Sequence, residues 1–170
     1  NLYGQSKRAG RKLLAKWAEN TGSLFTGLII PNVFGPFGIP DYNSVVATFC
    51  HKLAYNKKPI IEVDGDLKLI YIADLVEVII DVIRNSKGKG EMKIPHTSEI
   101  KVSVLLALLE KYKLLYQDGG VIPPLKSSFE LNLFNTYRCY MDIPNYFPIK
   151  FTQHTDQRGA FVEVIKLNVG

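Results

Sequence analysis

Short apolar runs alternate with longer amphipathic segments along most of this 170-residue chain. The amphipathic segments repeat their apolar residues at helical spacing, and they cover 2–20, 45–56, 75–86, 101–116 and 127–141. The apolar runs have the length of strands, and they cover 23–30, 60–63, 67–72 and 91–94. Strands and helices in alternation predict an α/β layer structure. With 170 residues, of which 46% are hydrophobic, the chain is long and apolar enough to form a domain with a sizeable core.

Local signals place the element boundaries. Gly22 can end the first helix. Ser44 and Asp74 stand where helix N-caps are wanted. The sequence DGD at 64–66 predicts a turn that pairs the strands 60–63 and 67–72. The segment 31–43 holds three prolines and two glycines, which predicts an irregular loop, whereas 23–30 reads as a strand buried on both faces.

The character of the sequence changes after Met141. DIPNYFPIK at 142–150 reads as a linker, and a turn at 156–159 precedes an apolar strand at 160–167. We expect this strand to have no partner among the remaining residues and to begin a second domain. KGKG at 87–90 reads as a break between helix and strand. The chain also starts without methionine, so we expect both ends to be incomplete.

Tyr3 and Lys7 stand four residues apart at the start of the first helix, which puts both side chains on one helix face. Ketone reduction by a nicotinamide needs an acid beside the carbonyl oxygen. A lysine ammonium ~4 Å from a phenol oxygen stabilises the phenolate by ~4 kcal/mol at an effective dielectric of ~20. Such a pair can therefore move a proton near neutral pH. The alternative is an ordinary surface pair on a basic helix.

Three motifs in series carry a family resemblance. YGQSK opens a helix, IIPNVFGP ends a strand, and LIYIADLVEVIIDVI follows further on. This series resembles the C-terminal half of an extended short-chain dehydrogenase/reductase of the NAD-dependent epimerase/dehydratase type. GIPDYNSVVATFCHKLAYNKKPIIEV, LFNTYRCYM and HTDQRGAFVEVIK are similar to bifunctional capsular-polysaccharide enzymes of the CapF type. Those enzymes join a nucleotide-sugar reductase to a C-terminal cupin.

The resemblance implies a fold and a division into domains. The fold is α/β: the C-terminal half of a Rossmann-like short-chain reductase with the first strand of a cupin domain. Residues 1–141 would be the incomplete reductase part, 142–150 the linker, and 151–170 the start of the cupin. No G-x-G-x-x-G occurs in the sequence, so we expect these residues alone to bind a dinucleotide weakly.

The resemblance also assigns catalytic and cofactor-binding roles. Tyr3 would be the general acid/base, and Lys7 its electrostatic partner and a ligand of the nicotinamide ribose. The backbone of Pro31, Asn32 and Val33 would meet the nicotinamide amide. The implied cofactor is NADP, with NAD possible.

Substrate binding is implied for Asn32, Tyr42, Asn43, Ser44 and Lys68. Asn32 would reach the substrate diphosphate, although a turn asparagine is the alternative. Tyr42, Asn43 and Ser44 lie at a loop–helix junction suited to phosphate or sugar hydroxyls, with an ordinary helix cap equally compatible. Related enzymes often place an arginine where Leu67 stands, and Lys68 is adjacent.

The resemblance implies an NADPH-dependent reductase of a nucleotide-diphosphate-4-keto-6-deoxy-sugar in bacterial capsular or surface polysaccharide biosynthesis. A 4-epimerase or dehydratase with tightly bound NAD is the enzymatic alternative. The implied substrate partner is a nucleotide-diphosphate sugar, and we expect a homodimer at full length.

Composition bears on the other classes of function. A basic-helix module for nucleic acid is the non-enzymatic alternative, because five of the basic residues lie in the first helix: Lys7, Arg8, Arg11, Lys12 and Lys16. The net charge of +5 is modest, and the basic face of an amphipathic helix explains the cluster. We therefore expect no nucleic-acid partner. No apolar run reaches the ~18–20 residues that a bilayer requires.

Two cysteines are too few for a disulfide framework, which favours reduced thiols and a cytoplasmic protein. The three histidines are spread through the sequence and form no metal-binding pattern. We therefore expect no metal site in this chain.

Overall fold

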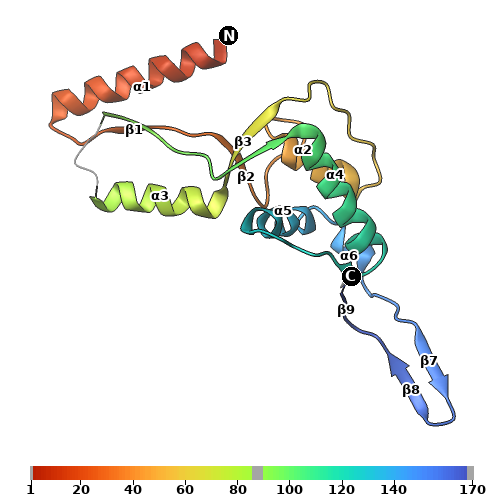
Figure 1. Cartoon of the computed structure of the whole chain (residues 1–170). Helices are drawn as coiled ribbons and strands as arrows, with labels where there is room; N and C mark the ends of the chain where they lie inside the picture. Colours follow the sequence, from red (N-terminus) through yellow and green to blue (C-terminus); the bar gives the residue numbers. More distant parts are fainter. Residues whose placement is uncertain (1, 86–89, 168–170) are drawn as a thin grey trace.

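The computed structural model describes residues 2–85 and 90–167, and it is an α/β structure (Figure 1). Its helices are α1 (Leu2–Thr21), α2 (Val45–Ala54), α3 (Ile72–Asn85), α4 (Val102–Tyr112), α5 (Ser128–Arg138) and α6 (Ile143–Tyr146), with a π-helix continuing α4 over Lys113–Asp118. Its strands are β1 (Thr26–Ile29), β2 (Asn32–Phe34), β3 (Asp66–Tyr71), β4 (Gly90–Lys93), β5 (Ser98–Lys101), β6 (Val121–Ile122), β7 (Gln153–Asp156), β8 (Gly159–Val162) and β9 (Lys166–Leu167).

Strand β3 lies at the centre of a three-stranded sheet. It pairs in parallel with β2, in the register Val33 opposite Ile70, and antiparallel with β5. Strands β1 and β4 form a separate parallel pair, which lies between α1 and α3 in Figure 1. Pro31 separates β1 from β2, because proline lacks the N–H that a continuous ladder needs.

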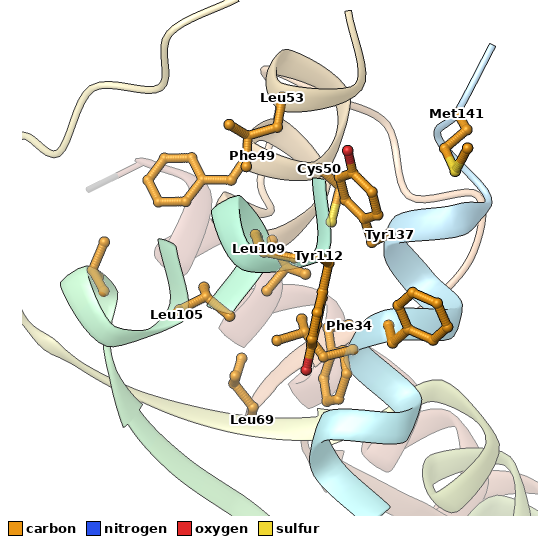
Figure 2. Close-up of a cluster of buried hydrophobic side chains, with 14 residues drawn as sticks. Phe34, Phe49, Cys50, Leu53, Leu69, Leu105, Leu109, Tyr112, Tyr137 and Met141 are labelled. Carbon is orange, nitrogen blue, oxygen red and sulfur yellow. The ribbon is translucent and has the colours of Figure 1, made fainter. Parts of the chain in front are cut away.

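Two hydrophobic clusters cover the opposite faces of β3. Successive side chains of a strand point to opposite faces, so Leu69 enters one cluster and Ile70 the other. The larger cluster joins β3 to α2, α4 and α5, and Figure 2 shows its side chains converging from these elements. Leu105, Leu109, Leu133 and Tyr137 are fully buried there. The smaller cluster joins Ile70 and Ile94 to Leu75 of α3.

Gly27 lets α1 approach the β1–β4 pair. A Cβ on Gly27 would lie 3.1 Å from the Cδ of Arg11, so the missing side chain leaves room for the arginine stem. The Arg11 guanidinium forms an ion pair with Glu91 of β4, the residue opposite Gly27 in the register. The helix ends as predicted, with Gly22 in the left-handed region at φ 66° and Ser23 N–H donating to the Ala18 carbonyl at 2.9 Å.

The predicted strand at 60–63 is wrong. Both edges of β3 are already occupied, by β2 and β5, so no edge remains to pair with residues 60–63. Asp64 of the predicted turn caps α4 instead: its carboxylate accepts the N–H and the hydroxyl hydrogen of Ser103, each at 2.8 Å. These two hydrogen bonds lower the pKa of Asp64.

Three other expectations need correction. Residues 32–34, predicted to be irregular, form β2 because β3 offers them an edge. Helix α3 begins at Ile72, directly after β3, so Asp74 lies inside the first turn, where the helix dipole favours an acid, rather than at the N-cap. Strand β1 is only half-buried, with Ile29 40% exposed, because it pairs on one edge alone among the described residues.

The segment after α6 projects from the body in Figure 1. Strands β7 and β8 form an antiparallel hairpin, so the strand predicted to have no partner pairs with residues 153–156. All residues of this hairpin are exposed. Strand β9 returns to the body and pairs in parallel with β6. The predicted break at 87–90 lies mostly outside the described residues.

Candidate active site

Tyr3 and Lys7 lie on one exposed face of α1, as their spacing predicts. The Lys7 ammonium nitrogen lies 5.3 Å from the centroid of the Tyr3 ring. The Tyr3 side chain is 63% exposed, so its hydroxyl is accessible to a ligand. A cation at this distance is attracted by the ring face, by ~0.5–1 kcal/mol at an exposed site. The helix thus places the Lys7 ammonium over the Tyr3 ring.

The apolar face of α1 is open towards its carboxyl end. Leu13, Leu14 and Trp17 are between 58% and 70% exposed. Ala18, by contrast, is buried. The helix thus rests on the β1–β4 pair through small and long-stemmed residues, while its large apolar side chains remain uncovered in the described structure.

Pro31, Asn32 and Val33 lie at the junction of β1 and β2. This is the carboxyl end of β1, the edge of a parallel sheet at which ligands bind in open α/β folds. Val33 packs into the smaller hydrophobic cluster, whereas the Asn32 side chain is exposed. The position suits contact between this backbone and a ligand, and the roles of these three residues stay a prediction.

A cavity of about 550 Å³ gathers three of the predicted substrate-binding residues. Its wall includes Tyr42, Asn43 and Ser44, together with the start of α2, residues 60–63, Leu67 and Val102. Tyr42 is 72% exposed. The segment 60–63, which forms no strand, therefore closes one side of this cavity.

Ser44 is the N-cap of α2, as predicted. Its hydroxyl oxygen accepts the Ala47 N–H at 3.2 Å, and its carbonyl accepts the Thr48 hydroxyl hydrogen at 2.8 Å. Thr48 in turn accepts the N–H of Asp41 at 2.9 Å, which ties the preceding loop to the helix. The cap leaves Ser44 on the cavity wall, so a structural and a ligand-binding role are compatible.

Lys68 does not join the other predicted substrate residues. Leu67 and Leu69 belong to the larger cluster, and Leu67 lines the cavity. Lys68 lies between them in β3 and therefore points to the opposite face of the sheet. The structure thus brings together Tyr42, Asn43 and Ser44 and leaves Lys68 apart from them.

Three charged residues on the cavity wall have no counterpart in the sequence-based prediction: Asp41, Lys52 and Glu62. The Lys52 ammonium lies 3.3 Å from a carboxylate oxygen of Asp41. The signal that could have identified Lys52 is its spacing: Ser44, Thr48 and Lys52 recur every four residues, which places them on one face of α2. All three line the cavity.

The loop before the cavity is fixed by Tyr140, which lies just after the end of α5. The Tyr140 hydroxyl donates to the carbonyl of Gly38 at 2.8 Å. Burial raises the pKa of Tyr140 to about 12, with a further rise from nearby Cys50. The phenol therefore remains a hydrogen-bond donor throughout the neutral range.

Both cysteines are free thiols: Cys50 is buried in the core and Cys139 is exposed. Burial raises the pKa of Cys50, which keeps it an inert core thiol. Residues 2–85 and 90–167 contain no group of three or more His, Cys, Asp or Glu side chains placed to hold a metal ion. Within the same ranges, no helix combines the length and the apolar character needed to cross a bilayer.

A family comparison matches residues 1–94, which contain α1, the β1–β2 junction, the cavity loop and α3. The matching model is that of the NAD dependent epimerase/dehydratase family. This chain belongs to that family. The family is one of enzymes, which favours the enzymatic prediction over the basic-helix module.

Named relatives extend the match beyond residue 94. The chain is 29% identical over 168 residues to the UDP-2-acetamido-2,6-beta-L-arabino-hexul-4-ose reductase of Pseudomonas aeruginosa, covering 98% of this chain and 45% of the relative. The crystal structure of the capsular polysaccharide assembling protein CapF from Staphylococcus aureus matches with a TM-score of 0.81 and 33% identity, covering 98% of this chain and 46% of that one. The chain thus spans about half the length of these relatives.

A more distant structure shares the fold alone. The UDP-glucose 4-epimerase of Thermotoga maritima matches with a TM-score of 0.63 at 21% identity, covering 81% of this chain and 52% of the epimerase. The Rossmann-like α/β fold predicted from the sequence is confirmed by these matches.

Proposed function

We propose that the protein is an NADPH-dependent reductase of a nucleotide-diphosphate-4-keto-6-deoxy-sugar, acting in the cytoplasm in bacterial capsular or surface polysaccharide biosynthesis. The observation that carries the proposal is the exposed Tyr3 phenol with the Lys7 ammonium 5.3 Å from its ring centroid, in a chain of the epimerase/dehydratase family. The name of the Pseudomonas aeruginosa relative, a reductase of a UDP-linked hexulose, supports this substrate class.

The residues present fit one part of a nicotinamide dinucleotide. Tyr3 and Lys7 offer a hydroxyl and an ammonium to the nicotinamide ribose, and the β1–β2 junction offers backbone to the nicotinamide amide. The sequence contains no glycine-rich turn for the pyrophosphate. The bound cofactor would supply the hydride for the sugar ketone.

The chain's own residues carry out the proton transfer. The Tyr3 hydroxyl donates its proton to the ketone oxygen, on which negative charge develops during reduction. The Lys7 ammonium stabilises the resulting phenolate electrostatically. Asn32, Tyr42, Asn43 and Ser44 hold the nucleotide sugar, and residues 151–170 begin a cupin domain in a full-length homodimer.

A 4-epimerase or dehydratase with tightly bound NAD is the second candidate. The family supports this candidate, because the family's name covers epimerases and dehydratases. Such an enzyme would use the same Tyr–Lys pair. The two candidates differ in net redox change: a reductase consumes NADPH, whereas an epimerase returns its cofactor to the starting state.

The test is an assay of the full-length gene product with a UDP-4-keto-6-deoxy-sugar and NADPH. The proposal expects loss of NADPH absorbance in a one-to-one ratio with formation of the 4-hydroxy sugar. With the corresponding UDP-4-hydroxy sugar and NAD supplied instead, interconversion of 4-epimers without net cofactor consumption would establish the second candidate. Absence of both reactions would refute the assignment to this chemistry.

A further inference from the structure

The cavity between the loop before α2 and residues 60–63 contains one basic side chain among the residues that line it, Lys52. Its acidic lining residues are Asp41 and Glu62. A nucleotide diphosphate that entered this cavity would need a cation, because its negative charge has to be compensated where water is partly excluded. Lys52 is the cation that the described wall provides.

The position and setting of Lys52 fit this task. It lies on the same face of α2 as Ser44 and Thr48, two turns below the N-cap. Its side chain is 30% exposed, so the stem is packed while the ammonium reaches the Asp41 carboxylate at 3.3 Å. The ammonium is thus held at the cavity by an acid from the loop that precedes α2.

Strand β3 provides no cationic side chain on the face that lines the cavity. Leu67, at the position where related enzymes often have an arginine, lines the cavity with an apolar side chain. Lys68 belongs to the other face of the strand. A diphosphate in the cavity therefore has to be neutralised from α2 and not from β3.

We propose that Lys52 binds the diphosphate of the nucleotide sugar and that Asp41 is an internal counter-ion which the substrate displaces. The inference rests on the proposed function, since it assumes that a nucleotide sugar occupies this cavity. Asp41 is 59% exposed in its side chain and lies at φ 54° in the loop. An ion pair this exposed is weak, so a diphosphate with two or more negative charges can replace the carboxylate.

The experiment is calorimetric titration of the full-length gene product with UDP and with uridine, in the presence of excess NADPH so that UDP cannot enter the dinucleotide site. Lys52→Met should weaken UDP binding about tenfold or more and leave uridine binding unchanged. Asp41→Asn should strengthen UDP binding about two- to fivefold, because it removes the competing charge. Asparagine tolerates a positive φ, so this variant should keep the loop conformation.

Lys111→Met, an exposed lysine on α4 outside the cavity, is the matched control and should bind UDP as the unaltered protein does. Unchanged UDP affinity in Lys52→Met, weaker UDP binding in Asp41→Asn, or loss of UDP affinity in Lys68→Met would each overturn the inference. Failure of the unaltered protein to bind UDP at all would overturn the proposed function instead, which keeps the two failures distinct.

Discussion

Tyr140→Phe tests how the loop before the candidate site is held in place. The substitution removes only the hydroxyl that donates to the Gly38 carbonyl at 2.8 Å. Both groups are half-buried, so water can partly replace the lost partner. We therefore expect a loss of ~1 kcal/mol in the free energy of unfolding, at the lower end of the cost of an unsatisfied group.

The assay is urea denaturation of the full-length gene product, combined with calorimetric titration of UDP. UDP affinity should fall as well, because the loop that Tyr140 fixes leads directly into Tyr42 and Ser44 on the cavity wall. Tyr55→Phe is the matched control: Tyr55 is 46% exposed, and its ring packs at a tilt against His51. A loss of stability below about 0.3 kcal/mol together with unchanged UDP affinity would refute the reasoning.

Three further predictions concern packing, pH and the catalytic pair. Gly35→Ala should destabilise the fold by ~1–3 kcal/mol in urea denaturation, because the new Cβ would collide with the side chain of Ile72 at the start of α3, and φ of Gly35 is 153°. Gly10→Ala is the control, because its new Cβ meets open space, and it should not destabilise the fold. Equal effects of the two substitutions would contradict this account. Burial raises the pKa of Tyr112 and of Tyr137, so their contribution to stability is complete below the unfolded pKa of ~10 and is lost as pH rises above it. A spectrophotometric titration should show these two phenols ionising together with unfolding. Ionisation of both phenols in the folded protein would argue against their burial. Lys7→Met should move the acid–base step of the pH–rate profile to higher pH and weaken NADPH binding, and a profile that overlays that of the unaltered protein would exclude the electrostatic role.

The sequence predicts well those elements whose signals are local. Gly22 and Ser44 act as helix boundaries where predicted, because each effect needs only the residue and its own helix. The Tyr3–Lys7 proximity follows from helix geometry alone and is observed. The family resemblance, carried by motifs of a few residues each, is confirmed by the comparison over residues 1–94.

Pairing between distant segments is where the prediction fails. Residues 60–63 are apolar enough for a strand, but β5, a short and polar strand that the periodicity did not reveal, occupies the edge of β3 that they would need. Asp64 then reaches Ser103 on α4, a contact between residues far apart in the sequence. Both outcomes depend on which segment pairs with the free edge of β3, and local sequence patterns do not determine that choice.

The candidate site shows the same limit. Tyr42, Asn43 and Ser44 could be selected as a group because they are consecutive. Lys52 could not be paired with Asp41 from the sequence, since their ion pair depends on how the loop folds back over α2. The alternation of side chains along a strand predicts that Lys68 and Leu67 point to opposite faces of the sheet. Only the structure shows that the face of Leu67 lines the cavity.

The most direct test of the central claim is the turnover of Tyr3→Phe in the full-length gene product. The account predicts a fall in kcat for NADPH-dependent ketone reduction of about 10²–10⁴-fold, because a positioned general acid typically supplies that much. It also predicts unchanged thermal stability, since the phenol is 63% exposed and only its hydroxyl is removed. Tyr55→Phe should retain full activity. A loss of less than about tenfold in Tyr3→Phe would contradict the assignment of Tyr3 as the proton donor.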